Sequence, residues 1–389
     1  MCLDGQGPNP LVLATDFNFY GTTGSGGNTS GGTVFKITSS GTLTTFYNFC
    51  SLPNCADGLE PYYALTQGAD GDLYGLTLGG GTGSGGTVFK VTRGGTLTTL
   101  YSFCSQTQCT DGGDPRGPLV QSTDENLYGT TYYGGANGGG SVFKITPGGS
   151  LTTLYSFCPN QPCVDGTQPN AGLIQATDGN FYGTTELGGF NDRGTVFQIT
   201  PAGKLTTLHS FCLHRPCVDG TYPGQLIQAS DGNFLGNTEG GGGHGYGTIF
   251  TIAPGGVLTT VYTFCSEKDC ADGIGSSATL MQATDGNFYG TNFYYGANSD
   301  GTIFRLDLGL GPFVAFVRGY GKIGETAAIL GQGLTGTSSV AINGIPADFT
   351  VVSDTSIRAT VPAGATTGYV TVTTPDGTLK SNVPFRVIP

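Results

Sequence analysis

Charged residues are scarce in this sequence, and basic residues do not cluster anywhere in it. Asp, Glu, Lys and Arg together make up 11% of the 389 residues, and the formal net charge is −12. A protein that follows the phosphate backbone of a nucleic acid needs a basic surface. We therefore expect no nucleic-acid partner.

Long apolar segments are also missing. No run approaches the roughly 20 apolar residues that a membrane-spanning helix needs, so no transmembrane segment is expected. The start, MCLDGQGPNP, has neither the basic residues nor the apolar stretch of a secretory signal. It matches the internal segment CVDGTQPN instead, so the sequence begins partway through a repeat and the missing signal carries little weight against export.

Catalytic signatures are few. The chain has three histidines, no H-E-x-x-H motif, and no Ser or Cys in the setting of a nucleophile elbow. His209 occupies a repeat position that holds Tyr in four other copies, so we interpret it as a substitution within a strand. His214 lies inside a short cysteine loop and His244 in a Gly-rich loop. We expect no catalytic residues and no enzyme, with a polysaccharide-acting enzyme as the less favoured alternative.

The sequence is rich in glycine, with 70 residues at regular intervals. The phrase LIQATDGNFYGTT, residues 173–185, recurs in six variants at a spacing of 53 or 54 residues. A second block follows, as in GTVFKITSSGTLTTFYNFC. Both blocks are rich in β-branched and aromatic residues, and their Asp-Gly and Pro-Gly steps supply the positive φ angles of tight hairpins. Each repeat therefore predicts four short strands.

Repeated units of four antiparallel strands are typical of a β-propeller, in which each blade buries its faces against its neighbours. The last copy, GTIFRLDLGL, ends before a fourth strand. We predict an all-β chain, with a β-propeller of about six four-stranded blades and an irregular closure; a β-helix is the alternative. Strand alternation places the tight turns at one face and the Gly-rich loops and inter-repeat connections at the other, where we expect function.

Ten of the eleven cysteines form pairs with four residues between the partners. The predicted disulfides are Cys50–Cys55, Cys104–Cys109, Cys158–Cys163, Cys212–Cys217 and Cys265–Cys270. Cys2 matches the second member of such a pair. Zinc binding is the alternative, but zinc usually needs four N or S ligands close together, and each pair belongs to its own repeat. Persistent disulfides indicate an oxidising compartment, so we expect an extracellular or cell-surface protein.

The repeat stops before residue 312. The segment 312–389 contains about seven short predicted strands separated by Gly, Pro, Asp and Asn turns. Its length and alternation favour an immunoglobulin-like β-sandwich without an inter-sheet disulfide. We therefore predict a propeller over residues 1–306, a short linker over 307–311 and an Ig-like domain over 312–389.

Two segments resemble known families. DGNFYGTT and KITPGGSLTTLYSF resemble the GloVer tandem repeat of bacterial choice-of-anchor surface proteins, over about residues 2–306. The segment GQGLTGTSSVAINGIPADFTVVSDTSIRATVPAGATTGYVTVTTPDG, residues 331–377, resembles an IPT/TIG domain. These resemblances imply an exported, often anchored bacterial protein with an Ig-like module, and the repeat family carries no established catalytic residues to transfer.

An aspartate follows the second cysteine of each pair in the pattern C-x-D-G. By the strand argument these aspartates circle the loop face, where a ring of carboxylates is suited to a hard cation such as calcium. The candidate ligands are Asp57, Asp111, Asp165, Asp219 and Asp272, and Asp4 holds the same place. The alternative is that each Asp-Gly caps a turn in its own connection. No other cofactor is expected.

Aromatic residues in the Gly-rich loops are the strongest binding signal. Rings on a rigid scaffold suit apolar sugar faces or a protein partner, while neighbouring Asn and Asp supply hydrogen bonds. The candidates are Tyr132, Tyr133, Phe190, Tyr246, Phe293, Tyr294 and Tyr295. The alternative is that these rings pack between blades. The leading hypothesis is a secreted or cell-surface binding or adhesion protein whose partner is a glycan or surface protein, and the second is a structural envelope component.

Overall fold

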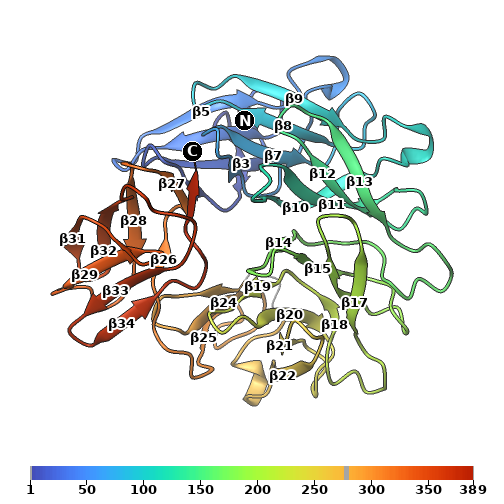
Figure 1. Cartoon of the computed structure of the whole chain (residues 1–389). Helices are drawn as coiled ribbons and strands as arrows, with labels where there is room; N and C mark the ends of the chain where they lie inside the picture. Colours follow the sequence, from blue (N-terminus) through green and yellow to red (C-terminus); the bar gives the residue numbers. More distant parts are fainter. Residues whose placement is uncertain (1, 276–279, 389) are drawn as a thin grey trace. The chain divides into compact units, whose positions relative to one another are not determined.

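The computed structural model describes residues 2–275 and 280–388, and its regular structure is β-strand apart from three single-turn 3-10 helices (Figure 1). These helices are Pro53–Cys55, Thr107–Cys109 and Lys268–Cys270. The chain forms two compact units. The first comprises Met1–Leu226, Gly236–Phe250 and Gly255–Phe264, and the second comprises Ile227–Leu235, Thr251–Pro254 and Cys265–Pro389.

The first five repeats each form one antiparallel sheet. The first sheet contains β1 (Gln6–Pro8), β2 (Val12–Leu13), β3 (Phe19–Ser25), β4 (Thr33–Ile37) and β5 (Leu43–Asn48). The second contains β6 (Thr66–Gln67), β7 (Leu73–Thr77), β8 (Thr87–Val91) and β9 (Leu97–Ser102). The third contains β10 (Gly113–Gln121), β11 (Leu127–Tyr133), β12 (Ser141–Ile145) and β13 (Leu151–Ser156).

The next two sheets follow the same order. The fourth contains β14 (Ile174–Gln175), β15 (Phe181–Thr185), β16 (Thr195–Ile199) and β17 (Leu205–Ser210). The fifth contains β18 (Thr221–Pro223), β19 (Ile227–Gln228), β20 (Phe234–Gly240), β21 (Thr248–Ile252) and β22 (Leu258–Thr263). The prediction of four antiparallel strands per repeat is therefore confirmed for the second, third and fourth copies, while the first and fifth sheets each contain one additional short strand, β1 and β18.

The Asp-Gly turns form as predicted. In the fourth sheet Gly179 has a φ of +84°, and Asp178 accepts the backbone N–H of Asn180 at 3.0 Å. The same carboxylate accepts the hydroxyl of Tyr182 at 2.8 Å, which ties the turn to β15. Burial and this bond raise the pKa of Tyr182 to about 12. The turn and the strand are thus held by one aspartate.

In five of the repeats the strand predicted first covers only two residues and is shorter than the prediction; β10 of the third repeat, with nine residues, is the exception. LIQAT predicts five residues, whereas β14 covers only Ile174–Gln175. The reason is that Ala176 already belongs to the turn: its N–H donates to the carbonyl of Asn180 at 2.9 Å, and its own carbonyl accepts the N–H of Gly179 at 2.9 Å.

The core of the first unit lies between successive sheets. One buried cluster joins two neighbouring repeats and contains Tyr128, Val142, Phe157, Leu173, Phe181, Phe197 and Ile199. The ring of Tyr128, on β11, stacks on that of Phe181, on β15, with centroids 4.1 Å apart. A repeat completes its core only with the next repeat, as blades of a propeller do.

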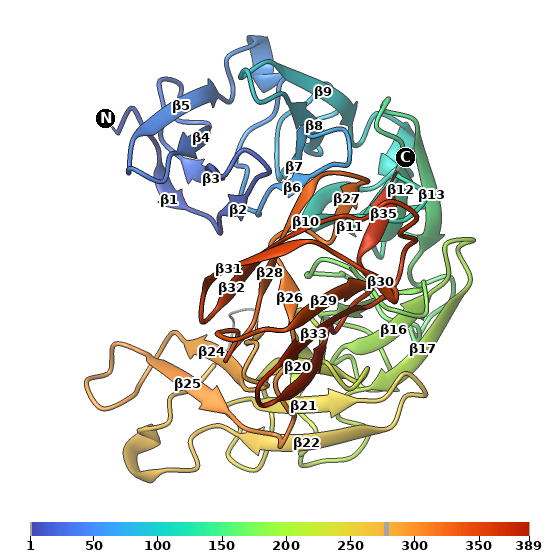
Figure 2. The same cartoon turned by 60° about the vertical axis from the view of Figure 1, so that its left-hand side comes forward.

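The sixth repeat belongs to the second unit and contains β23 (Met281–Gln282), β24 (Phe288–Asn292) and β25 (Thr302–Leu306). Among the described residues this sheet has three strands, as the truncated last copy predicts. The Ig-like part follows (Figure 2). Its strands are β26 (Ala315–Phe316), β27 (Tyr320–Lys322), β28 (Thr326–Leu330), β29 (Ser339–Ile342), β30 (Ile345–Pro346), β31 (Phe349–Ser353), β32 (Ser356–Thr360), β33 (Val370–Thr374), β34 (Gly377–Lys380) and β35 (Arg386–Ile388).

These strands form a sandwich. One sheet has the order β26-β28-β32-β31 and the other β30-β29-β33-β34, while β27 and β35 form a parallel pair. The core between them includes Val314, Ile329, Ile342, Ile357, Val370, Val372 and Phe385, all buried. The sandwich has more strands than the seven predicted, because turns such as Asn343–Gly344, both at positive φ, fold short segments back as extra strands. The sequence-based boundaries at residues 306 and 312 stay a prediction.

Candidate functional site

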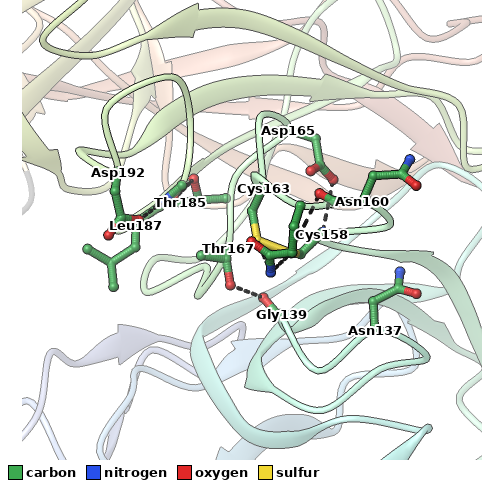
Figure 3. Close-up of a disulfide and its surroundings, with 12 residues drawn as sticks. Asn137, Gly139, Cys158, Asn160, Cys163, Asp165, Thr167, Thr185, Leu187 and Asp192 are labelled. Carbon is green, nitrogen blue, oxygen red and sulfur yellow. Dashed lines mark hydrogen bonds between the residues drawn. A yellow bond between two sulfur atoms is a disulfide. The ribbon is translucent and has the colours of Figure 1, made fainter.

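The predicted disulfides form, and each closes a short loop in the connection between two repeats. The bonded pairs are Cys50–Cys55, Cys104–Cys109, Cys158–Cys163, Cys212–Cys217 and Cys265–Cys270. Figure 3 shows Cys158–Cys163, between the third and fourth repeats. Cys2 is an exposed free thiol.

Each disulfide connection holds the Gly-rich loops next to it. The carbonyl of Cys163 accepts the N–H of Gly189, in the loop of the fourth repeat, at 2.9 Å. On the other side, Thr167 donates its hydroxyl at 3.1 Å to the carbonyl of Gly139, in the loop of the third repeat (Figure 3). The bond to the second cysteine recurs at Gly27, Gly81, Gly135, Gly242 and Gly296. Hydrogen bonds to the disulfide connections therefore hold the backbone of these loops in place.

The C-x-D-G aspartates are acceptors within their own connections. Asp57 is buried, and one of its oxygens accepts the hydroxyls of Tyr47 and Ser51, each at 2.8 Å. Asp165 accepts the hydroxyl of Tyr155 at 2.9 Å. Among the described residues, no three His, Cys, Asp or Glu side chains lie close enough together to hold a metal ion. The structure therefore does not bring the five predicted calcium ligands together; they are Asp57, Asp111, Asp165, Asp219 and Asp272.

His209 takes the place of tyrosine in this arrangement. Its Nε2 lies 2.9 Å from Oδ2 of Asp219, and its ring packs edge-on against Phe211 with centroids 4.9 Å apart. Both contacts reproduce those that tyrosine makes in other repeats. His214 and His244 are exposed.

Tyr132, one of the predicted binding residues, is partly covered. The guanidinium carbon of Arg116 lies 3.9 Å from the centroid of its ring, and its hydroxyl donates to Gln168 at 3.0 Å. Arg116 also donates to Asp114 at 2.8 Å and to Asn170 at 2.6 Å. One face of the Tyr132 ring therefore already has a cationic partner.

The other aromatic candidates of the first unit, Tyr133, Phe190 and Tyr246, are exposed. Phe190 follows the paired glycines of its loop, and its N–H donates to the hydroxyl of Ser210 at 2.8 Å. The next residue, Asn191, donates its side-chain amide to the carbonyl of Cys212 at 2.6 Å. The phenyl ring thus projects from backbone that the end of β17 and the neighbouring disulfide hold in place.

The sixth repeat presents three consecutive aromatic candidates in the second unit. Phe293, Tyr294 and Tyr295 are 70%, 61% and 44% exposed. The centroids of the Phe293 and Tyr294 rings are 6.0 Å apart, and the planes are tilted by 50°. The backbone below them is fixed, because the carbonyl of Tyr294 accepts the N–H of Ile274 at 3.2 Å.

Tyr295 has a backbone conformation that the other repeats give to glycine. Its φ is +65°, and the equivalent residues are Gly26, Gly80, Gly134, Gly188 and Gly241, with φ between +73° and +80°. In the third repeat a Cβ at Gly134 would lie 2.5 Å from the carbonyl oxygen of Cys109, so no side chain fits there. A tyrosine at positive φ costs about 1 kcal/mol relative to glycine.

Sequence reasoning missed the polar residues that surround Tyr132. Asp114 and Gln168 each precede a proline at the start of a repeat and have φ values of +52° and +56°. Glu60 and Tyr222 occupy the same position with φ of +61° and +58°. One sequence signal could have identified this position. The proline recurs from repeat to repeat while the residue before it varies, which indicates that the fold does not require one residue type there.

Two glutamates extend the polar group along the first unit. Glu186 and Glu239 hold the repeat position that Tyr132 holds in the third repeat: Glu186 directly follows β15, and Glu239 lies near the end of β20. Burial raises the pKa of Glu239, and the charge of Glu186 raises it further. Burial and the charge of Glu186 also raise the pKa of Tyr132. Together with Arg116 these groups offer donors and acceptors suited to a ligand that carries several hydroxyls.

Comparison with protein families identifies both parts of the chain. The sequence model of the Gloeobacter/Verrucomicrobia repeat matches residues 2–109 and 212–332. The model of the IPT/TIG domain matches residues 315–387. No curated protein matches the chain.

Two solved bacterial enzymes are among the structures that this chain resembles. Virginiamycin B lyase from Staphylococcus aureus superposes with a TM-score of 0.52 at 14% identity, over 92% of this chain and 97% of the lyase. A periplasmic gluconolactonase from Pseudomonas aeruginosa gives a TM-score of 0.48 at 18% identity, over 91% of this chain and 88% of the other. The likeness to the lyase supports the predicted β-propeller, and at this identity it carries no activity.

The disulfides and the domain types of the chain agree with a surface protein. Its five disulfides fit an oxidising compartment. Repeats joined to an Ig-like domain fit a surface or binding protein. Within the described residues, no helix has the length and apolar character to cross a membrane.

Proposed function

Since this chain belongs to the Gloeobacter/Verrucomicrobia repeat family, we propose that it is an exported, cell-surface or secreted protein that binds carbohydrate through the aromatic loops of its repeats. It acts by adhesion rather than by catalysis. The partner is a surface glycan, and the aromatic loop of the sixth repeat, Phe293–Tyr295, is the principal contact.

The observation that carries this proposal is Tyr295. Five repeats place glycine at this position, and the sixth places a large aromatic residue there at a φ of +65°. Backbone strain persists where a function depends on the residue that bears it. The side chain is also substantially exposed, so the strain does not serve the packing of a core.

The neighbouring rings supply the chemistry. Phe293 and Tyr294 present tilted rings whose centroids are 6.0 Å apart, and apolar sugar faces pack on rings of this kind. Asn298 and Asp300, both exposed in the same loop, offer hydrogen-bonding groups beside them. In the first unit, Tyr133, Phe190 and Tyr246 provide further aromatic contacts on pre-formed loops.

The test is binding of the oxidised full chain to a glycan array and to insoluble polysaccharides. Tyr294→Ala should lower the affinity at least tenfold. Tyr295→Gly should lower it too, while leaving the thermal midpoint unchanged or higher, because glycine is the residue that this backbone conformation prefers. The matched control is Phe17→Gly, which removes another exposed aromatic ring from a turn where four repeats already have glycine.

The outcomes separate the proposal from its competitor. Saturable binding that falls in both tyrosine variants but not in Phe17→Gly supports a glycan site on this loop. Absence of binding to any glycan would overturn it and favour the structural envelope component. Binding that is unchanged in Tyr294→Ala and Tyr295→Gly would remove the loop from the site.

A further inference from the structure

The third strand of the sixth repeat has an open edge. In the third repeat β12 pairs with β13 on one side and β11 on the other. In the sixth repeat β25 pairs with β24 and, among the described residues, forms the edge of its sheet. Figure 2 shows β25 at the outer side of this sheet. Unpaired strand edges readily accept a further strand.

A large apolar side chain is uncovered beside this edge. Ile303 is 83% exposed, whereas Val142, its equivalent on β12, is fully buried. Val142 owes part of this burial to the fourth strand: Tyr155 lies opposite it in the ladder, and Phe157 packs in the same cluster. Ile303 is therefore uncovered at the place where a fourth strand would contribute its aromatic residues.

The backbone frame for that strand is retained. Gly140, just before β12, has a φ of +91°, and its carbonyl accepts the N–H of Phe157 at 3.0 Å. Gly301, just before β25, has a φ of +89°. The sequence GTIFRL of the sixth repeat also keeps the alternation of GSVFKI in the third. The sixth sheet thus keeps the backbone conformation that, in the third repeat, presents a carbonyl to the fourth strand, although among the described residues it has no fourth strand.

We propose that β25 and the surface around Ile303 form a docking site for an extended segment with the sequence pattern of the repeat's own fourth strand, carried by a partner polypeptide. The five repeats that have a fourth strand define this occupant, because its pattern is LTT-x-Y in four of them and LTTLH in the other. The segment adds as an antiparallel strand, with its main chain supplying hydrogen bonds and its tyrosine and phenylalanine covering Ile303.

The third repeat fixes the register. There Leu151 lies opposite Ile145, and Tyr155 lies opposite Val142. Transferred to the sixth repeat, the leucine of the incoming segment lies opposite Leu306 and its tyrosine opposite Ile303. This proposal does not depend on carbohydrate binding.

The probe is a fluorescent peptide with the sequence SLTTLYSF, residues 150–157, titrated into the full chain. We expect saturable binding and slower amide hydrogen exchange in residues 302–306. Ile303→Asp should weaken binding at least tenfold, because the aspartate puts a charge against the tyrosine of the peptide. A peptide with Asp in place of its tyrosine should bind as weakly. Val257→Asp, at another exposed aliphatic residue, is the control and should leave binding unchanged.

Two results would overturn the proposal. One is the absence of peptide binding to a chain whose thermal unfolding is intact. The other is binding that persists in Ile303→Asp or that protects amides elsewhere. Tyr294→Ala, designed against the carbohydrate site, should bind the peptide normally, so failure of one proposal is distinguishable from failure of the other.

Discussion

His209 Nε2 lies 2.9 Å from Asp219 Oδ2, in the position where Tyr155 donates its hydroxyl to Asp165 at the same distance in the preceding repeat. His209 thus replaces the tyrosine of the other repeats: it lies in a strand and contacts the aspartate of the connection that follows. His209→Ala should lower the free energy of unfolding by about 1–2 kcal/mol, because Asp219 loses a partner while remaining partly buried. Urea unfolding followed by circular dichroism measures this difference. His209→Tyr should be nearly neutral, and a loss as large as that of alanine would contradict equivalence of the two side chains.

Acid should destabilise the chain through its connecting aspartates. Burial raises the pKa of Asp57, but hydrogen bonds from Ser51, Tyr47 and Leu52 lower it more, so the pKa lies below its usual value of 3.8. A carboxyl whose pKa is depressed by folding stabilises the protein above the unfolded pKa, and this contribution is lost as the pH falls through the folded pKa.

The corresponding variant is Asp57→Asn. It should be less stable than the parent chain at pH 7, and the difference should shrink as the pH falls from about 4 towards 2. Thermal midpoints across this pH range provide the measurement. A difference that stays constant with pH would mean that the charge on Asp57 contributes nothing to stability.

Removal of one disulfide should loosen the Gly-rich loop that its second cysteine holds. In the double variant Cys158→Ala/Cys163→Ala, we expect a loss of about 2 kcal/mol from the greater freedom of the unfolded chain. Amide exchange should also become faster at Gly189, which donates to the carbonyl of Cys163. Cys2→Ser is the control and should leave both readouts unchanged. Unaltered exchange at Gly189 would show that the loop keeps its conformation without the disulfide.

Glu186 should control the protonation of Glu239. Because burial and the charge of Glu186 both raise the pKa of Glu239, Glu186→Gln removes the second cause and should lower that pKa. A carbon-13 NMR titration of the glutamate carboxyls gives the shift directly. Tyr132, whose pKa the same charge raises, should also ionise at lower pH in this variant. If the pKa values of Glu239 and Tyr132 are both unchanged in this variant, neither group interacts with the charge of Glu186.

Much of the architecture was predictable because it depends on local signals. Alternating β-branched and aromatic residues define β15, β16 and β17, and glycine at positive φ defines the turns between them. Cysteines with four residues between them close local loops, which needs no knowledge of distant contacts. The first strands were overestimated because LIQAT is apolar over its whole length, although its Ala176 is already bonded across the turn.

The sequence by itself determined the repeated sheets, the disulfide connections and the break in the sixth copy, because each follows from residues close together along the chain. Only the tertiary structure decided which side chains meet between repeats. Arg116 covers Tyr132 and reaches Asn170, 54 residues away, so one of the aromatic residues predicted to bind a ligand is already partly covered. The strain at Tyr295 and the exposure of Ile303 likewise depend on backbone geometry and on neighbouring strands, which no local pattern specifies.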